Sequence, residues 1–333
     1  MGPALVRWLA AAAAVRGRSH GQRKEACQDY VRQVVTRSFC GVALADGAGS
    51  AAHGGKGAAV AAASTLQFLV AQFSDLLDAG MHSAGCRVVG ACVAAMEGAA
   101  RDAGIPLRQM ATTLLVAAVS RGRFFVGQIG DGVIGREQQG QVRPVFAPHR
   151  GEFYNETKFV TDPDASESFS VEMGPASDIQ GFILMSDGSA ESLFSRRESA
   201  LAPACATMLS WLDSARPRDV DRALGRSLRK RLRPRTTDDC SIAVLRRVTD
   251  SLETLTTRPP EFQRSFLDLR STQGLATRLR VLRLLSASAA DLSDDCVPAD
   301  SHVTRATLRR HRGALQELFA NGPPVPQTGR IPH

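Results

Sequence analysis

Ser38-Phe-Cys-Gly-Val-Ala-Leu-Ala45, followed at once by Asp46-Gly47-Ala48-Gly49-Ser50, joins an unbroken apolar run to an acidic turn. The run predicts a buried strand that ends at Asp46. Three more acidic turns stand where an apolar run ends or begins: Asp131-Gly132, Asp187-Gly188 and Asp238-Asp239. One Asp-Gly pair is usually a turn former, but four at strand edges indicate carboxylates that converge on a divalent metal, because hard cations take oxygen ligands. The chain is therefore an enzyme candidate.

The segments around this stretch alternate between groups of strands and pairs of helices. Helices are expected over 56–73, 84–103, 199–213 and 217–232, and strands over 179–185 and 240–248. Residues 112–119 and 123–129 predict a hairpin, and 133–136 with 142–146 are expected to extend its sheet as a meander. This order favours an α+β fold, an antiparallel β-sandwich with helices on both outer faces, over a doubly wound parallel sheet.

Composition limits the alternatives. The chain has 333 residues, 44% of them hydrophobic, and seven scattered cysteines with no C-x-x-C pair, which favours a reducing cytoplasm over a disulfide framework. The net charge of +8 comes largely from late arginines without interleaved aromatic residues, so a solvated face is favoured over a nucleic-acid site. No membrane span is expected. Leu5 to Val15 resembles a signal peptide, but its apolar region is short and alanine-rich, so secretion is not expected.

Composition shifts near residue 249 to Thr, Arg and Pro, followed by amphipathic stretches near 264–288 and 302–320. This shift predicts two parts: a domain over 1–248, and a C-terminal appendage over 249–333 that is partly helical or disordered and of unknown role.

Six short motifs carry a resemblance to a known family: Cys27-Gln28-Asp29, Asp46-Gly47-Ala48-Gly49-Ser50, Ala111-Thr112-Thr113-Leu114, Gln128-Ile129-Gly130-Asp131-Gly132, Met185-Ser186-Asp187-Gly188 and Asp238-Asp239-Cys240-Ser241-Ile242. In order and spacing they resemble the metal-dependent serine/threonine protein phosphatases of the 2C class, over roughly residues 17 to 248. The resemblance is strongest to the bacterial branch with Asp-Gly-Ala-Gly-Ser.

The resemblance implies a four-layer αββα fold and two bound Mg²⁺ or Mn²⁺ ions, with a third and weaker site. It also implies that a metal-bridging hydroxide hydrolyses phosphoserine or phosphothreonine in a phosphoprotein, without a phosphoenzyme, in opposition to a Ser/Thr kinase. Paired cations lower the pKa of a shared water and aim it at phosphorus. A cytoplasmic location fits this activity.

The same resemblance implies residue roles. Asp46 is similar to the aspartate that bridges two metals, and Gly47 to the residue whose carbonyl binds the second. Asp187 and Asp238, the latter preferred to Asp239, match the other carboxylate ligands of the first metal. Asp131 matches a ligand of the third metal. Gln28 and Asp29 match residues that orient metal-bound water, and Lys24 matches a residue that binds the substrate phosphate.

Three departures from the family pattern bear on activity. Gln28 stands where better-known members carry glutamate, which removes a negative charge. Lys24 stands near the usual place of an arginine that binds the substrate phosphate. An arginine would bind phosphate through two hydrogen-bond donors at once, whereas a lysine offers a single point charge. Ala48 stands where eukaryotic members of the family have a histidine, whose implied role is that of an acid that protonates the leaving group. His20, His53 or a metal-bound water would have to substitute, although either histidine could equally be structural.

Two other functions stay open at this stage. Gln28 and Lys24 suit a catalytically weak, phosphatase-like module that binds phosphoproteins and regulates a partner. Gly47 to Ala52 also fits the G-x-G-x-x-A dinucleotide fingerprint, which would imply an oxidoreductase. Against it, no acidic residue ends a second strand and no βαβ alternation follows. The polar segment 148–178, including Asn155-Glu156-Thr157, is expected to contribute to substrate choice.

Overall fold

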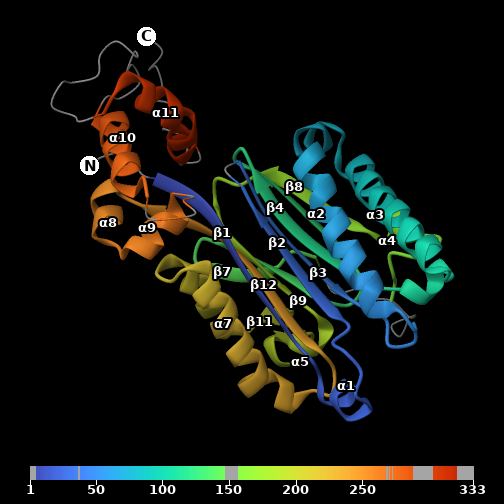
Figure 1. The fold of residues 1–333 in the computed structure, drawn as a ribbon. Coiled ribbons are helices and arrows are strands. Elements are labelled where there is room, and N and C mark those ends of the chain that lie inside the picture. Colours follow the sequence, from blue (N-terminus) through green and yellow to red (C-terminus); the bar gives the residue numbers. More distant parts are fainter. Residues whose placement is uncertain are drawn as a thin grey trace, which may run out of the picture.

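Two five-stranded antiparallel sheets pack face to face, and helices cover both outer faces (Figure 1). The structure is a computed structural model, which describes residues 5–36, 38–146, 157–267, 269, 271, 273–287 and 303–320. The α+β prediction of an antiparallel sandwich with helices outside is confirmed.

The first sheet has the strand order β1-β12-β9-β6-β7. All four neighbouring pairs are antiparallel, and the register joins Val15 to Cys240 and Ile242 to Met185. The strands are β1 (Leu5–Val15), β6 (Val133–Gln138), β7 (Gln141–Pro144), β9 (Ile179–Met185) and β12 (Cys240–Asp250).

The second sheet has the order β2-β3-β4-β5-β8, again with antiparallel neighbours. Its strands are β2 (Asp29–Val35), β3 (Phe39–Asp46), β4 (Leu114–Ser120), β5 (Arg123–Ile129) and β8 (Ser170–Pro175). A separate two-stranded ribbon joins β10 (Phe194–Ser195) and β11 (Ala200–Leu201).

Helices cover the two sheets differently. The long pair α2 (Gly54–Asp78) and α3 (Met81–Ala103) packs over the second sheet, followed by the 3₁₀ turn η1 (Leu107–Met110). The first sheet is covered by α5 (Asp187–Leu193), α6 (Pro203–Ser210), η2 (Trp211–Asp213), α7 (Pro217–Ser227) and the π-helical turn η3 (Leu228–Leu232). The short elements α1 (Arg18–Arg23), α4 (Ala165–Ser168) and η4 (Arg233–Arg235) lie in connections.

Helix α2 is long and apolar enough, by length and composition, to cross a membrane. In the structure its inward face, which includes Ala58, Leu66 and Leu69, is fully buried in the cluster that also contains strand residues of the second sheet. This burial is how a helix that covers a sheet is stabilised.

Three apolar layers explain why the central strands read as unbroken hydrophobic runs. In β3, Val42 and Leu44 face the layer between the sheets, while Ala43 and Ala45 face the helices. The central strands β3 and β4 are thus buried on both faces, and burying a Leu or Val side chain contributes about 1.5–3 kcal/mol.

The structure corrects two expectations about strands. Strands β6 and β7 do not extend the hairpin of β4 and β5, because β6 pairs with β9 in the other sheet. The stretch Leu5–Val15, weighed above only as a signal-like segment, is the edge strand β1, paired with β12 along its whole length.

The part of the chain after residue 249 that the structure describes is helical: α8 (Leu252–Thr257), α9 (Pro260–Phe266), α10 (Leu275–Ala287) and α11 (Arg305–Ala320). Buried side chains from these helices, including Phe266, Leu282 and Leu315, share one apolar cluster with the outer face of the first sheet. The domain boundary near residue 248 stays a prediction.

Candidate active site

The acidic turns named in the sequence meet at one end of the sandwich. Asp46 ends β3, Asp131 joins β5 to β6, Asp187 begins α5 directly after β9, and Asp238 precedes β12. All four, together with Gly47, line one pocket of about 330 Å³. Antiparallel pairing across two facing sheets therefore brings together carboxylates that lie up to 192 positions apart in the chain.

Asp46 is held by its neighbours on both sides. Its backbone N–H donates to Thr113 Oγ1 (3.0 Å), and its carbonyl accepts from the Thr112 hydroxyl (2.8 Å) and the Thr113 N–H (2.9 Å). Across the sheet its register partner is Asp29, which is buried. Thr112 and Thr113 thus fix the backbone from which the Asp46 carboxylate projects.

The carboxylates repel one another in a site that is largely shielded from water. Burial, together with the nearby charges of Asp29 and Asp187, raises the pKa of Asp46 to about 12. Burial, then Asp131 and Asp238, raises the pKa of Asp187 to about 6. Such a cluster gains most from a bound cation, which would neutralise the charges that now oppose one another.

Asp29 lies behind this cluster. Burial, with a further contribution from the charge of Asp239, raises its pKa to about 7. A carboxyl group in this position can hold or release a proton near neutral pH next to Asp46. This geometry is compatible with the water-orienting role predicted for Asp29.

The donor chemistry fits Mg²⁺ or Mn²⁺. Every acidic ligand offered by the pocket is an aspartate oxygen, and hard cations prefer oxygen. Within the described residues, no group of three or more His, Cys, Asp or Glu side chains is already arranged to hold an ion alone. Mg²⁺ commonly binds through one or two carboxylates and keeps several waters, so an open acidic pocket suits it better than a closed cage would.

Adjacent Asp238 and Asp239 have different surroundings. Asp238 lines the pocket. Asp239 is buried and accepts hydrogen bonds from the backbone N–H groups of Gly17 (2.5 Å) and Gln28 (2.6 Å). Burial opposes its charge, but these hydrogen bonds and His20 outweigh that effect and hold the Asp239 pKa below its ordinary value. This arrangement favours Asp238 as the ligand and gives Asp239 a structural role.

The glycines of the acidic turns are required by close backbone packing. A Cβ on Gly47 would lie 2.2 Å from the carbonyl carbon of Gly54, and one on Gly188 would lie 2.2 Å from the carbonyl oxygen of Asp239. Real Cβ atoms do not approach backbone so closely. Both glycines therefore let a second segment reach the turn that carries an aspartate.

The segment between β1 and β2 places a different cation at the pocket from the one named in the sequence prediction, and the phosphate-binding role of Lys24 stays a prediction. Lys24 is the exposed C-cap of α1 in the left-handed conformation (φ 59°), and it is not among the residues that line the pocket. Arg23 lines the pocket instead, and its Nε lies 2.8 Å from Glu25 Oε2. The sequence contained this arginine one position earlier, but the turn of α1 that selects it was not evident.

His20 lines the pocket, whereas the described lining does not include His53. The His20 ring is buried, with Nδ1 3.0 Å from Asp239 Oδ1. His53 is exposed and is the residue that precedes α2. Of the two histidines considered as replacements for the acid missing at Ala48, only His20 faces the candidate site.

Gln28 is held beside the site but outside the residues described as lining the pocket. Its carbonyl accepts from the Gly47 N–H (3.2 Å), and its side-chain Oε1 is buried without a hydrogen-bond partner. An unpaired buried acceptor is costly, so a hydrogen-bond donor beside the Gln28 amide would stabilise this part of the site.

One side of the pocket comes from the polar segment after β7. Thr157 donates from Oγ1 to Asp131 Oδ2 (2.8 Å), and Phe159 also lines the pocket. Asn155 and Glu156, which the sequence analysis singled out with Thr157, lie outside the described residues. The segment thus reaches the candidate site through its first described residues.

Residues 16–231 match the family model described as protein phosphatase 2C. The chain belongs to the protein phosphatase 2C family. The match covers the pocket-lining segment from Ser19 to Asp187 and most of the sandwich. Members of this family are metal-dependent phosphatases, in agreement with the oxygen-rich donor set described above.

Solved structures show the same 2C-type fold. A bacterial serine phosphatase aligns with a TM-score of 0.51 at 14% identity, over 72% of this chain and 98% of that chain. A C. elegans sex determining protein aligns with a TM-score of 0.51 at 13% identity, over 74% of this chain and 65% of that chain. A comparison with curated protein sequences finds no match.

Proposed function

We propose that this protein is a metal-dependent phosphatase that hydrolyses phosphoserine and phosphothreonine in proteins. The observation that carries the proposal is the convergence of Asp46, Asp131, Asp187 and Asp238 on one pocket in a chain of the 2C family. The Asp-Gly-Ala-Gly-Ser sequence at 46–50 supports placement in the bacterial branch.

In this proposal Asp46, Asp187, Asp238 and the Gly47 carbonyl hold two Mg²⁺ or Mn²⁺ ions, and Asp131 contributes to a third. When bound, such ions supply activation of the attacking water and neutralisation of phosphate charge. Asp29, buried behind Asp46, and Gln28 orient the water by hydrogen bonding.

The remaining pocket residues bind the substrate and assist the leaving group. Arg23 takes the phosphate-binding role that was predicted for Lys24, because Arg23 lines the pocket and a guanidinium offers a planar pair of donors. His20, oriented by buried Asp239, is the group placed to donate a proton to the leaving alkoxide.

The substrate and cellular setting follow from the activity and remain part of the proposal. The substrate is a phosphoprotein, the opposing enzyme is a Ser/Thr kinase, and the location is the cytoplasm, which the cysteine pattern favours. Neither a nucleic acid nor a membrane is needed as a partner.

A second candidate is a phosphatase-like module that binds phosphoproteins with little turnover. Two observations favour it: Gln28 lacks the charge of a glutamate, and Arg23 is engaged by Glu25. The dinucleotide alternative needs a parallel βαβ unit. Its glycines instead follow β3, which pairs antiparallel with both neighbours.

These candidates are separated by a hydrolysis assay. The substrates are a phosphoserine peptide and p-nitrophenyl phosphate, each measured with Mn²⁺ and with chelator. We expect Mn²⁺-dependent turnover that Asp187→Asn lowers by at least a hundredfold, because a ligand oxygen and its charge are lost. Asp102→Asn, an exposed carboxylate on α3, is the matched control and should keep wild-type turnover.

Peptide binding without turnover in the wild type would favour the module. Turnover that persists in chelator, or that Asp187→Asn leaves intact, would contradict the proposed function.

A further inference from the structure

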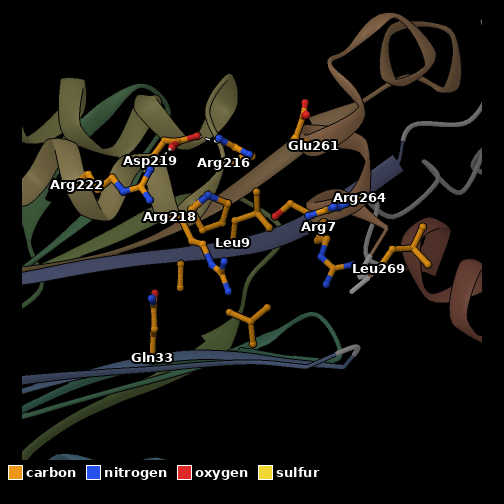
Figure 2. A pocket seen from close by; sticks show the side chains of 14 residues that line it. Arg7, Leu9, Gln33, Arg216, Arg218, Asp219, Arg222, Glu261, Arg264 and Leu269 are labelled. Atoms are coloured by element: carbon orange, nitrogen blue, oxygen red, sulfur yellow. Dashed lines mark hydrogen bonds and ion pairs between the residues drawn. The ribbon is translucent and has the colours of Figure 1, made fainter. Parts of the chain in front are cut away.

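A second cavity, of about 580 Å³, lies away from the acidic pocket (Figure 2). It opens where the edge strand of each sheet meets α7 and α9, so its wall comes from both the sandwich and the C-terminal helices. Ala10, the residue of β1 in this wall that is nearest in sequence to Val15, is five residues before it, and at about 3.3 Å per residue this length of β1 spans roughly 16 Å. The cavity is therefore a separate feature.

The wall of this cavity is rich in arginine. Five guanidinium groups and two carboxylates line it. Asp219 is already engaged by Arg216 (2.6 Å) and Arg222 (3.3 Å). In Figure 2, Glu261 points away from the arginines below it. The balance of charge in the wall is thus positive, which suits an anion.

Two of these arginines are available to a ligand. Arg218 is exposed on the first turn of α7, and its side chain points into the space between β1 and the strand that carries Gln33 (Figure 2). Arg264, on α9, also lines the cavity, and its Nε has no hydrogen-bond partner. An unsatisfied donor is costly, so an acceptor such as a phosphate oxygen that bonded to this guanidinium would stabilise the protein.

Apolar side chains also line the cavity, and together they are called its apolar side. Leu9 on β1, Val35 at the end of β2 and Leu269 after α9 contribute to the wall. Val35 is 37% exposed, which is unusual for a large aliphatic side chain in this molecule. A cavity of this size with one charged and one apolar side is typical of a site for a small organic ligand.

We propose that this cavity binds a small phosphorylated molecule, with its phosphates on Arg218 and Arg264 and its apolar body against Leu9, Val35 and Leu269. Guanidinium groups bind phosphate oxygens in pairs, which accounts for arginine in the wall where lysine would give only a point charge. The site joins the C-terminal helices to the edge of the sandwich and goes beyond the proposed hydrolysis.

The test is calorimetric titration of the full chain with inorganic pyrophosphate and with ADP, in chelator and at fixed ionic strength. The chelator removes metal from the acidic pocket, so the result does not depend on the proposed phosphatase function. We expect one saturable site per chain for each probe. ADP should bind at least threefold more tightly than pyrophosphate, because only ADP can also cover the apolar side.

Arg218→Gln/Arg264→Gln should weaken both probes at least tenfold. Arg101→Gln, which removes the same charge from an exposed position on α3, should leave binding unchanged. Arg218→Gln alone changes one exposed side chain, so it can replace the double variant if that variant does not fold. The single variant should weaken binding of both probes at least threefold.

No saturable binding of either probe, or equal affinity in wild type and the cavity variants, would overturn the proposal. ADP binding no tighter than pyrophosphate would overturn the assignment of the apolar side.

Discussion

At the scale of single residues, the candidate site depends on two adjacent aspartates with separate tasks. Asp238 faces the acidic pocket, whereas Asp239 accepts two backbone hydrogen bonds and lies 3.0 Å from His20. Asp239 thereby fixes the segment from Gly17 to Gln28, which carries Arg23 and His20 to the pocket.

This division predicts that the same Asp→Asn change affects stability differently at the two positions. Asp239→Asn should lower the free energy of unfolding by about 2–3 kcal/mol, because buried N–H donors lose a charged acceptor. Asp238→Asn should change it by less than about 1 kcal/mol in chelator, since it relieves repulsion in the pocket. Urea unfolding of both variants measures the difference, and a larger loss for Asp238→Asn would contradict the assignment.

Residue types were predictable at the site, but individual orientations were not. The four aspartates that precede or follow apolar runs were evident from the sequence, because strands of a sandwich end at a common edge. Whether Arg23 or Lys24 lines the pocket depends on where α1 stops in the left-handed conformation. The choice of His20 over His53 depends on a contact with Asp239, 219 positions away.

At the scale of elements, a buried ion network joins three pieces of the first sheet and its cover. Arg246 on β12 donates through Nε and Nη2 to Asp213 in η2 (2.9 Å each) and through Nη1 to Glu137 on β6. Arg246 and Glu137 side chains are only 13% and 11% exposed. Burial raises the pKa of Glu137, and Arg246 opposes that rise.

Replacing Arg246 alone should therefore lower the free energy of unfolding more than replacing Arg246 and Glu137 together. Arg246→Met leaves Glu137 buried without its partner, and we expect a loss of about 3 kcal/mol in the free energy of unfolding. Arg246→Met/Glu137→Met should recover at least about 1 kcal/mol of that loss. Denaturant unfolding of the two variants checks this order, and a double variant less stable than the single one would contradict it.

Some of the strands were predictable from the sequence, and others were not. The β4–β5 hairpin was predicted because its β-branched and aromatic residues flank a short turn. Strand β1 was not, because its alanine-rich run from Ala10 to Ala14 lacks the β-branched residues typical of strands. Strand β6 was placed in the wrong sheet, since closeness in the chain does not show that Asp131-Gly132 crosses to the opposite layer.

At the scale of the whole molecule, two sites lie at separate places on one sandwich. The acidic pocket forms where β3, β9 and β12 reach one end, and the arginine-lined cavity forms where β1, β2, α7 and α9 meet. The layered fold was predictable because strands and helices were grouped along the chain. The second cavity was not, because its wall combines arginines from three distant segments.

The proposed function requires that Asp46, Asp187 and Asp238 together hold divalent ions. Calorimetric titration of the full chain with Mn²⁺ tests this most directly, with Asp46→Asn as the variant and Asp102→Asn as the control. We predict saturable Mn²⁺ binding by the wild type and the control, and at least tenfold weaker binding by Asp46→Asn. Equal Mn²⁺ affinity in all three proteins, or no binding by the wild type, would contradict the account.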